Sequence, residues 1–146
     1  MPEKIKAKRV INGTWGQLWF EGNLVGETYK LQAKDNYTRE DVLLCGSLRP
    51  GKKLTKIDST GTIGLFKVNS RMIQMIDEKV SAGNDPEFTL VSKLEDPDSY
   101  GAERVALTGV QFDDLTLADW EAGVLGKIEC PFTFQNHEFL DKIKVD

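Results

Sequence analysis

The 146-residue chain is 40% hydrophobic and 29% charged, which is ordinary for a soluble globular protein and predicts neither disorder nor a membrane span. A domain of this size buries roughly two-thirds of its unfolded surface, so we expect residues 1–146 to form a single domain. A net charge of −4 argues against a sequence-reading nucleic-acid module, which usually presents a basic face. No run suits a transmembrane helix or a signal peptide, so we expect cytoplasmic synthesis and no membrane binding by the subunit.

The two ends of the chain have polar compositions. Residues 1–12 include four basic residues, and we expect a mobile basic N-terminal arm there, not a binding site. Residues 136–146 are expected to be a polar C-terminal tail. The single histidine, His137, falls in this tail and is expected to be solvated.

Residues 14–34 alternate in the manner of β-strands around a tight turn, which predicts a β-hairpin. The period of two places Trp15 and Trp19 on one face, and Leu18 and Phe20 on the other. Because both faces carry bulky side chains, one should pack on the core and the other on a second layer or another subunit.

The next stretch, residues 35–53, is charged in its first half and then apolar, and a Pro-Gly pair near its end marks the tip of a long hairpin or loop. Such a projection is a solvated loop by default, or an element that reaches over a neighbouring subunit. Three basic residues make the tip cationic. The residues that would form such an interface are Val42, Leu43, Leu44, Arg49, Lys52 and Lys53.

Residues 54–83 give the clearest pattern in the chain. Thr- and Ile-rich residues 54–68 predict a strand. The period then changes to that of an amphipathic helix, with Asn69 or Ser70 as the N-cap and Gly83 at the C-terminal end. The residues expected to pack the helix on the sheet are Met72, Ile73, Ile76 and Val80, whereas Arg71, Gln74 and Glu78 should face outward.

The rest of the chain predicts more strands. Residues 87–95 alternate, and residues 103–115 form a strand that changes face at Gly109, which indicates a bulge or bend. Residues 116–122 fit one helical turn, and residues 126–135 fit a final strand. About seven strands and one helix predict a mainly β (α+β) fold: an antiparallel β-sandwich or partly open β-barrel with one flanking α-helix.

The sequence contains no recognisable catalytic or ligand-binding motif. No GxSxG elbow accompanies the lone histidine, and no Gly-Lys pair extends into a phosphate-binding loop. Cys45 and Cys130 lack CxxC companions and are expected to be unpaired apolar fillers of strands. We therefore predict no enzyme activity, no cofactor and no metal site. The surplus of aromatic residues favours an interaction surface.

Three ordered blocks resemble the tail tube protein family of contractile-tailed phages and phage-like particles, especially tube proteins of the PBSX type of defective Bacillus prophage. The first is Asn-Gly-Thr-Trp-Gly-Gln-Leu-Trp at residues 12–19. The second is Gly-Thr-Ile at 61–63 leading to Lys-Val-Asn-Ser-Arg-Met at 67–72. The third joins Asp-Trp-Glu-Ala-Gly at 119–123 with Pro-Phe-Thr-Phe at 131–134, so that the blocks span nearly the whole chain.

This resemblance implies a structural protein without catalysis. Its subunits would form hexameric rings that stack into an inner tail tube, a passive conduit surrounded by tail sheath and attached to baseplate proteins. Residues 35–53 would then reach an adjacent ring. DNA would be only non-specific passing cargo, and the protein would be made in the bacterial cytoplasm and assembled into the particle.

Three alternatives remain open at this point. A monomeric small-ligand-binding β-barrel would need an apolar cavity. A small hydrolase is disfavoured because the sequence lacks a nucleophile paired with a base. A baseplate-associated tube-like protein would share the sequence features of the main tube protein.

Overall fold

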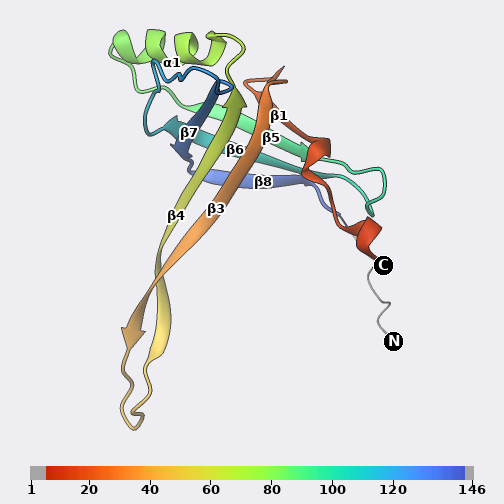
Figure 1. The fold of residues 1–146 in the computed structure, drawn as a ribbon. Helices are drawn as coiled ribbons and strands as arrows, with labels where there is room; N and C mark the ends of the chain where they lie inside the picture. Colours follow the sequence, from red (N-terminus) through yellow and green to blue (C-terminus); the bar gives the residue numbers. More distant parts are fainter. Residues whose placement is uncertain (1–5, 144–146) are drawn as a thin grey trace.

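A computed structural model describes residues 6–143 as one unclosed antiparallel sheet of eight strands, with a helix beside one end and a long hairpin projecting from the other (Figure 1). This confirms the mainly β fold with a flanking helix. Two short 3-10 helices precede the sheet, η1 (Ala7–Arg9) and η2 (Gly13–Trp15). The other elements are β1 (Gly16–Phe20), β2 (Asn23–Leu24), β3 (Thr28–Val42), β4 (Gly51–Phe66), α1 (Arg71–Ser81), β5 (Phe88–Leu94), β6 (Glu103–Phe112), β7 (Lys127–Thr133) and β8 (Asn136–Asp141).

The sheet folds into two leaves at β6. Its strand order is β2-β1-β5-β6-β7-β4-β3, and β8 also pairs with β6. The first part of β6 pairs with β5 and β8, whereas only Gln111 and Phe112 pair with β7. Between these parts Gly109 has a φ of 66°, in the left-handed region that glycine adopts without strain. The bend expected at Gly109 is therefore confirmed.

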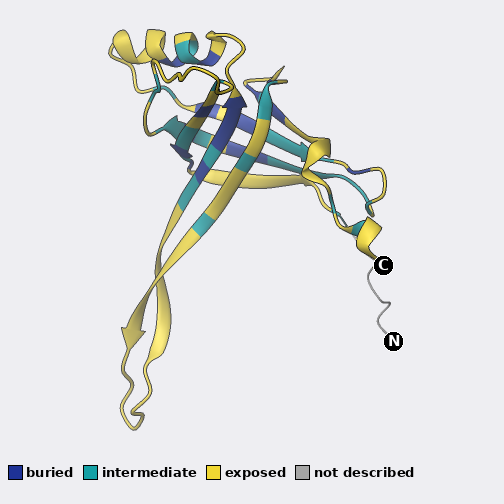
Figure 2. Ribbon diagram, viewed as in Figure 1, coloured by how far each residue is buried: buried dark blue, intermediate teal, exposed yellow. Residues whose placement is uncertain are grey.

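The core lies between the two leaves and is confined to the body of the molecule (Figure 2). Phenylalanine rings from several strands form a continuous chain through it: Phe20 lies 4.9 Å from Phe88, and Phe112 lies 5.7 Å from Phe88 and 6.2 Å from Phe132, between ring centroids. Leu18 and Phe20, expected on one face, are both buried. Trp19 is partly buried, whereas Trp15 is exposed and lies in η2 and not in the strand. The buried cluster is Leu18, Phe20, Val25, Ile63, Leu65, Met72, Ile76, Phe88, Leu90, Leu107, Val110, Phe132 and Phe134.

Helix α1 packs on this core through one face. Met72 and Ile76 are buried and Ile73 is partly buried, but Val80 is 55% exposed, so its predicted packing role is wrong. By helical angle Val80 lies between Ile76 and Ile73, so its exposure follows from its place in the last turn of α1 and not from the face that it occupies. The last turn instead places the Lys79 ammonium 4.9 Å from the Phe88 ring centroid. The expected outward residues Arg71, Gln74 and Glu78 are exposed.

Both ends of α1 follow the sequence signals. The Asn69 side chain accepts a hydrogen bond from the Arg71 N–H at 3.0 Å, whereas the Ser70 side chain makes no capping bond. After the last turn, Gly83 has a φ of 85° and donates its N–H to the Val80 carbonyl. The helix therefore begins at an asparagine that accepts a backbone hydrogen bond, and it is followed by a glycine in the left-handed conformation.

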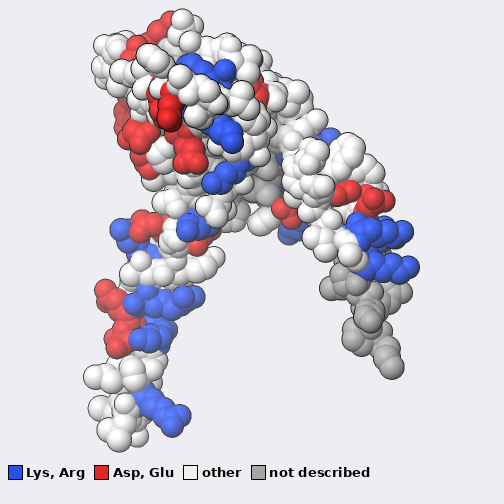
Figure 3. Space-filling model, viewed as in Figure 1, with Lys and Arg blue, Asp and Glu red and all other residues white. Residues whose placement is uncertain are grey.

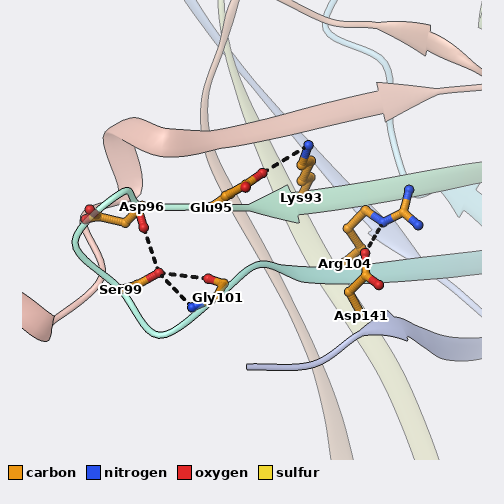
Figure 4. A network of polar contacts seen from close by, with 7 residues as sticks. All are labelled: Lys93, Glu95, Asp96, Ser99, Gly101, Arg104 and Asp141. Carbon is orange, nitrogen blue, oxygen red and sulfur yellow. Dashed lines mark hydrogen bonds and ion pairs between the residues drawn. The ribbon is translucent and has the colours of Figure 1, made fainter. Parts of the chain in front are cut away.

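The C-terminal segment differs from expectation. Residues 136–141 are not an irregular polar tail but form β8, which pairs with β6 from Arg104 to Thr108. Arg104 and Asp141 join the two strands at one end through a 2.6 Å ion pair (Figure 4). Every β8 residue is exposed, so strand pairing and not burial defines this strand.

The N-terminal segment also contacts the body. The Arg9 guanidinium donates to the Asp98 carbonyl oxygen at 3.0 Å, and the Asn12 N–H donates to the buried Asp96 carboxylate at 2.9 Å. Figure 4 shows this β5–β6 turn, where the Ser99 hydroxyl bonds to the backbone of Asp96 and Gly101. Residues 6–12 are therefore attached to the turn and not a free arm, and residues 1–5 of the expected arm lie outside the described residues.

Three further expectations need correction. Residues 116–122 form no helical turn but belong to an irregular β6–β7 segment, residues 113–126. The second strand of the hairpin expected over residues 14–34 is instead a two-residue β2 followed by the start of β3, which continues through the charged residues to Val42. Cys45 is exposed outside any strand, whereas Cys130 lies half-buried in β7.

Candidate functional site

A groove of about 720 Å³ lies at the base of the projecting hairpin, beside β8. Its lining brings together a serine, a carboxylate and the single histidine. The Ser59 hydroxyl donates to Asp35 Oδ1 at 2.6 Å, and His137 Nδ1 lies 3.6 Å from Asp35 Oδ2. These residues come from β4, β3 and β8, so the cluster joins three strands.

The order of contacts in this cluster does not suit nucleophilic catalysis. A catalytic serine gives its proton to a histidine, and the carboxylate orients that histidine from its other side. Here Asp35 lies between Ser59 and His137, so no imidazole base contacts the hydroxyl. His137, expected to be solvated, is exposed, and its ring stands edge-on to that of Phe139 at 5.6 Å between centroids. The cluster therefore connects strands.

The hairpin of β3 and β4 is the other prominent feature. Every residue from 36 to 58, which we call the arm, is exposed (Figure 2). Its strands pair continuously from Asn36 opposite Asp58 to Val42 opposite Gly51, apart from one register shift beside Arg39. A two-stranded ribbon without a core is marginally stable in water, and residues 36–58 bury no side chain within the part of the chain that the structure describes.

Charges along the arm are matched across its strands. Lys52 forms an ion pair with Asp41, and Lys53 lies opposite Glu40. Figure 3 shows acidic and basic side chains side by side along the arm. The cationic tip expected from the sequence is therefore reduced to Arg49, because both lysines belong to β4 and face carboxylates.

The tip, residues 43–50, is mainly apolar. Leu43, Leu44 and Leu48 are strongly exposed, and Leu48 is 100% exposed. The Ser47 hydroxyl holds the turn by accepting from the Arg49 N–H at 3.2 Å and donating to the Arg49 carbonyl oxygen at 3.1 Å. Three exposed leucines on a projecting element are typical of a protein contact surface.

The predicted site residues thus fall into two places. Val42, Leu43, Leu44 and Arg49 lie at the end of the arm, and Met72, Ile73 and Ile76 lie on the face of α1 that packs on the core. Sequence reasoning missed Leu48 and the apolar residues of the β6–β7 segment. In both stretches the apolar residues follow neither a strand period nor a helix period, and this irregular spacing was the available sign that they do not pack in the core.

Within residues 6–143, no group of three or more His, Cys, Asp or Glu residues is arranged to hold a metal ion. Burial, and secondarily the Asp114 carboxylate, raises the pKa of the Cys130 thiol, which keeps this thiol protonated. In the same residues, no helix has the length and apolar character to cross a membrane.

A bent antiparallel sheet, an exposed arm and an apolar tip define a protein whose surface is suited to contacts with other protein chains. Comparison with known proteins agrees. The family model described as phage tail tube protein matches residues 3–141. The chain is 32% identical over 142 residues to the phage-like element PBSX protein XkdM of Bacillus subtilis strain 168, covering 95% of this chain and 96% of that protein.

Solved structures share the fold. A chain of the anti-feeding prophage cap superposes with a TM-score of 0.72 at 9% identity, covering 96% of this chain and 97% of that chain. A chain of the PVC sheath–tube complex, an extracellular contractile injection system, gives 0.70 at 6% identity, covering 91% and 93%. The chain belongs to the phage tail tube protein family and is a structural tail tube protein.

Proposed function

We propose that this protein forms hexameric rings that stack into the inner tube of a contractile phage or phage-like particle. The observation that carries the proposal is the arm, which is wholly exposed in the single subunit and ends in three leucines that the described residues leave strongly exposed. Burial of each leucine in a neighbour is favourable by about 1.5–3 kcal/mol, and many copies of the contact act together in a stacked tube.

The tube is a passive conduit in this proposal. Tail sheath surrounds it and baseplate proteins hold one end, as the sheath–tube and baseplate complexes of structural neighbours suggest by analogy. DNA passes only as non-specific cargo, for which the negative net charge is suitable because an anionic wall does not retain phosphate. The subunit performs no catalysis, and it is made in the bacterial cytoplasm before incorporation into the particle.

Electron microscopy of the purified chain tests this proposal. At high concentration and moderate salt, the wild-type protein should form rings and tubes in negative stain. A matched variant replaces residues 43–50 by Asn-Gly, a two-residue turn that can join Val42 to its partner Gly51 without disturbing the rest of the arm. This variant should fold normally and form no tubes.

Three outcomes would contradict the proposal. A wild-type chain that stays monomeric and binds a small molecule would favour the ligand-binding alternative. Normal tubes from the shortened variant would show that the arm does not join rings. A chain that forms single rings only in the presence of baseplate proteins would favour the baseplate-associated alternative.

A further inference from the structure

The arm tip and the β6–β7 segment lie at opposite ends of the subunit. β4 runs from the tip to the neighbourhood of α1 (Figure 1), and its 16 residues at about 3.3 Å each span about 50 Å. Just after β4, the Lys67 N–H donates to the Gly126 carbonyl oxygen at 2.7 Å. Leu115 lines a small pocket together with α1. A subunit therefore cannot bring its own tip to this segment.

The β6–β7 segment presents apolar side chains to solvent although its ends are fixed. The Asp113 N–H donates to the Pro131 carbonyl oxygen at 2.9 Å at one end, and Gly126 is bonded to Lys67 at the other. Between these anchors, Trp120 is 87% exposed and Leu125 77%. Leu117 and Val124 are also exposed. Such a cluster on an anchored segment is typical of a binding surface.

The tip and the β6–β7 segment both expose apolar side chains, and their charges are also complementary. The β6–β7 segment contains four carboxylates and no basic residue, whereas the tip contains Arg49 and no carboxylate. Several acidic side chains gather on the body below α1 (Figure 3). The four carboxylates are Asp113, Asp114, Asp119 and Glu121.

We propose that the tip of one subunit docks on the β6–β7 segment of a second copy of this chain in the next ring. The tip leucines pack against Trp120 and Leu125, and Arg49 lies among the carboxylates around Trp120. This inference rests on the proposed tube function and specifies the surface that receives the arm. Because the two surfaces differ, the contact is heterologous and repeats from ring to ring without closing on itself.

Cross-linking on assembled tubes tests the contact directly, since Cys45 is exposed in the tip. In a Cys130→Ser background, Ala122→Cys places a second thiol beside Trp120, and Asp98→Cys places one on the β5–β6 turn as a matched control. A short bismaleimide should convert Ala122→Cys tubes into a ladder of covalent multimers. It should leave Asp98→Cys tubes, and tubes with Cys45 alone, as monomers on a denaturing gel.

Charge reversal gives a second readout. Arg49→Glu should lower tube yield by about tenfold or more because many copies of the contact act together. Combining it with Asp119→Lys and Glu121→Lys should restore the yield. Each variant should retain the wild-type unfolding midpoint, since all three side chains are exposed.

The outcomes separate this inference from the proposed function. If the wild-type chain forms no tubes, both fail. If wild-type tubes form but Ala122→Cys gives no ladder, the tip docks elsewhere and only the receiving surface is wrong. Equal ladders from Asp98→Cys, or Arg49→Glu tubes at wild-type yield with no effect of the compensating lysines, would also overturn the contact.

Discussion

Gly61 is the residue at which β4 approaches both its partner strand and the core. A Cβ atom built at this position would run into the Gln32 carbonyl oxygen and into the ring of the fully buried Phe132. Neither can move freely, because one is backbone and the other is enclosed. Gly61 is therefore required for packing as well as for the strand.

Gly61→Ala should destabilise the subunit by about 1–3 kcal/mol through overpacking. Gly26→Ala is the matched control, because a Cβ at Gly26 meets no atom within 4 Å. Urea unfolding followed by circular dichroism measures the difference. Similar midpoints for the two variants would show that β3 and β7 adjust without cost.

Ile76 and Val80 test the orientation of α1. Ile76→Asp places a charge in the core and should unfold the subunit, since even truncation of a buried isoleucine costs about 2–5 kcal/mol. Val80→Asp, one turn later on an exposed position, should change stability by less than about 1 kcal/mol. Thermal unfolding of both variants distinguishes them. A folded Ile76→Asp subunit that only fails to assemble would mean that α1 contacts a neighbour.

The two cysteines should differ in reactivity. Cys45 is exposed, whereas burial and the Asp114 carboxylate raise the pKa of Cys130. Because the thiolate is the nucleophile, iodoacetamide at neutral pH should alkylate Cys45 rapidly and Cys130 slowly. Mass spectrometry of the time course measures both, and unfolding in urea should equalise them. Rapid labelling of native Cys130 would show that β7 opens.

Sequence reasoning succeeded for elements with a buried face. β5, the bend in β6 and the start of α1 all show a period set by the core, and the structure places them as predicted. The same reasoning failed for β8, whose residues are all exposed and which exists only because β6 offers backbone partners. A local pattern carries no information about such a partner.

In the arm, sequence analysis predicted some features correctly and missed others. Its position and turn were predictable from the Pro-Gly pair and the apolar residues before it. The continuity of β3 was not, because both faces of the arm meet water and the period of two disappears. The ion pair of Lys52 with Asp41 was also hidden, since cross-strand register depends on the loop length.

Limited proteolysis should report the exposure of the arm. In the free subunit, trypsin should cut first between residues 36 and 58, where basic residues are exposed and the ribbon lacks a core. Assembled tubes should resist this cleavage, since a neighbour covers the end of the arm. Mass spectrometry of the early fragments locates the cuts. First cleavage within β5 or β6 would contradict the stability order inferred from burial.

At the scale of the whole molecule, the proposed contact gives the subunit a direction. One end donates a tip and the other receives one, so every ring in a stack points the same way. Ring closure must use other surfaces, for which the unpaired edges of β3 and β8 are available.

A subunit without its tip should therefore limit tube growth. The variant with Asn-Gly in place of residues 43–50 keeps the receiving segment but cannot donate. Mixed with wild-type protein at increasing fractions, it should shorten tubes progressively, as measured by microscopy. The same fraction of Ile76→Asp should have little effect, because an unfolded subunit does not enter rings. Unchanged lengths with the shortened variant would contradict a directional contact.

The absence of any core in the arm also affects the kinetics of assembly. Before stacking, each subunit carries a ribbon whose outer end is held by few interactions, and the first two rings must order several such ribbons at once. Later rings add to a surface that already exists. Tube formation should thus begin after a concentration-dependent lag and then elongate quickly, and short preformed tubes should remove the lag.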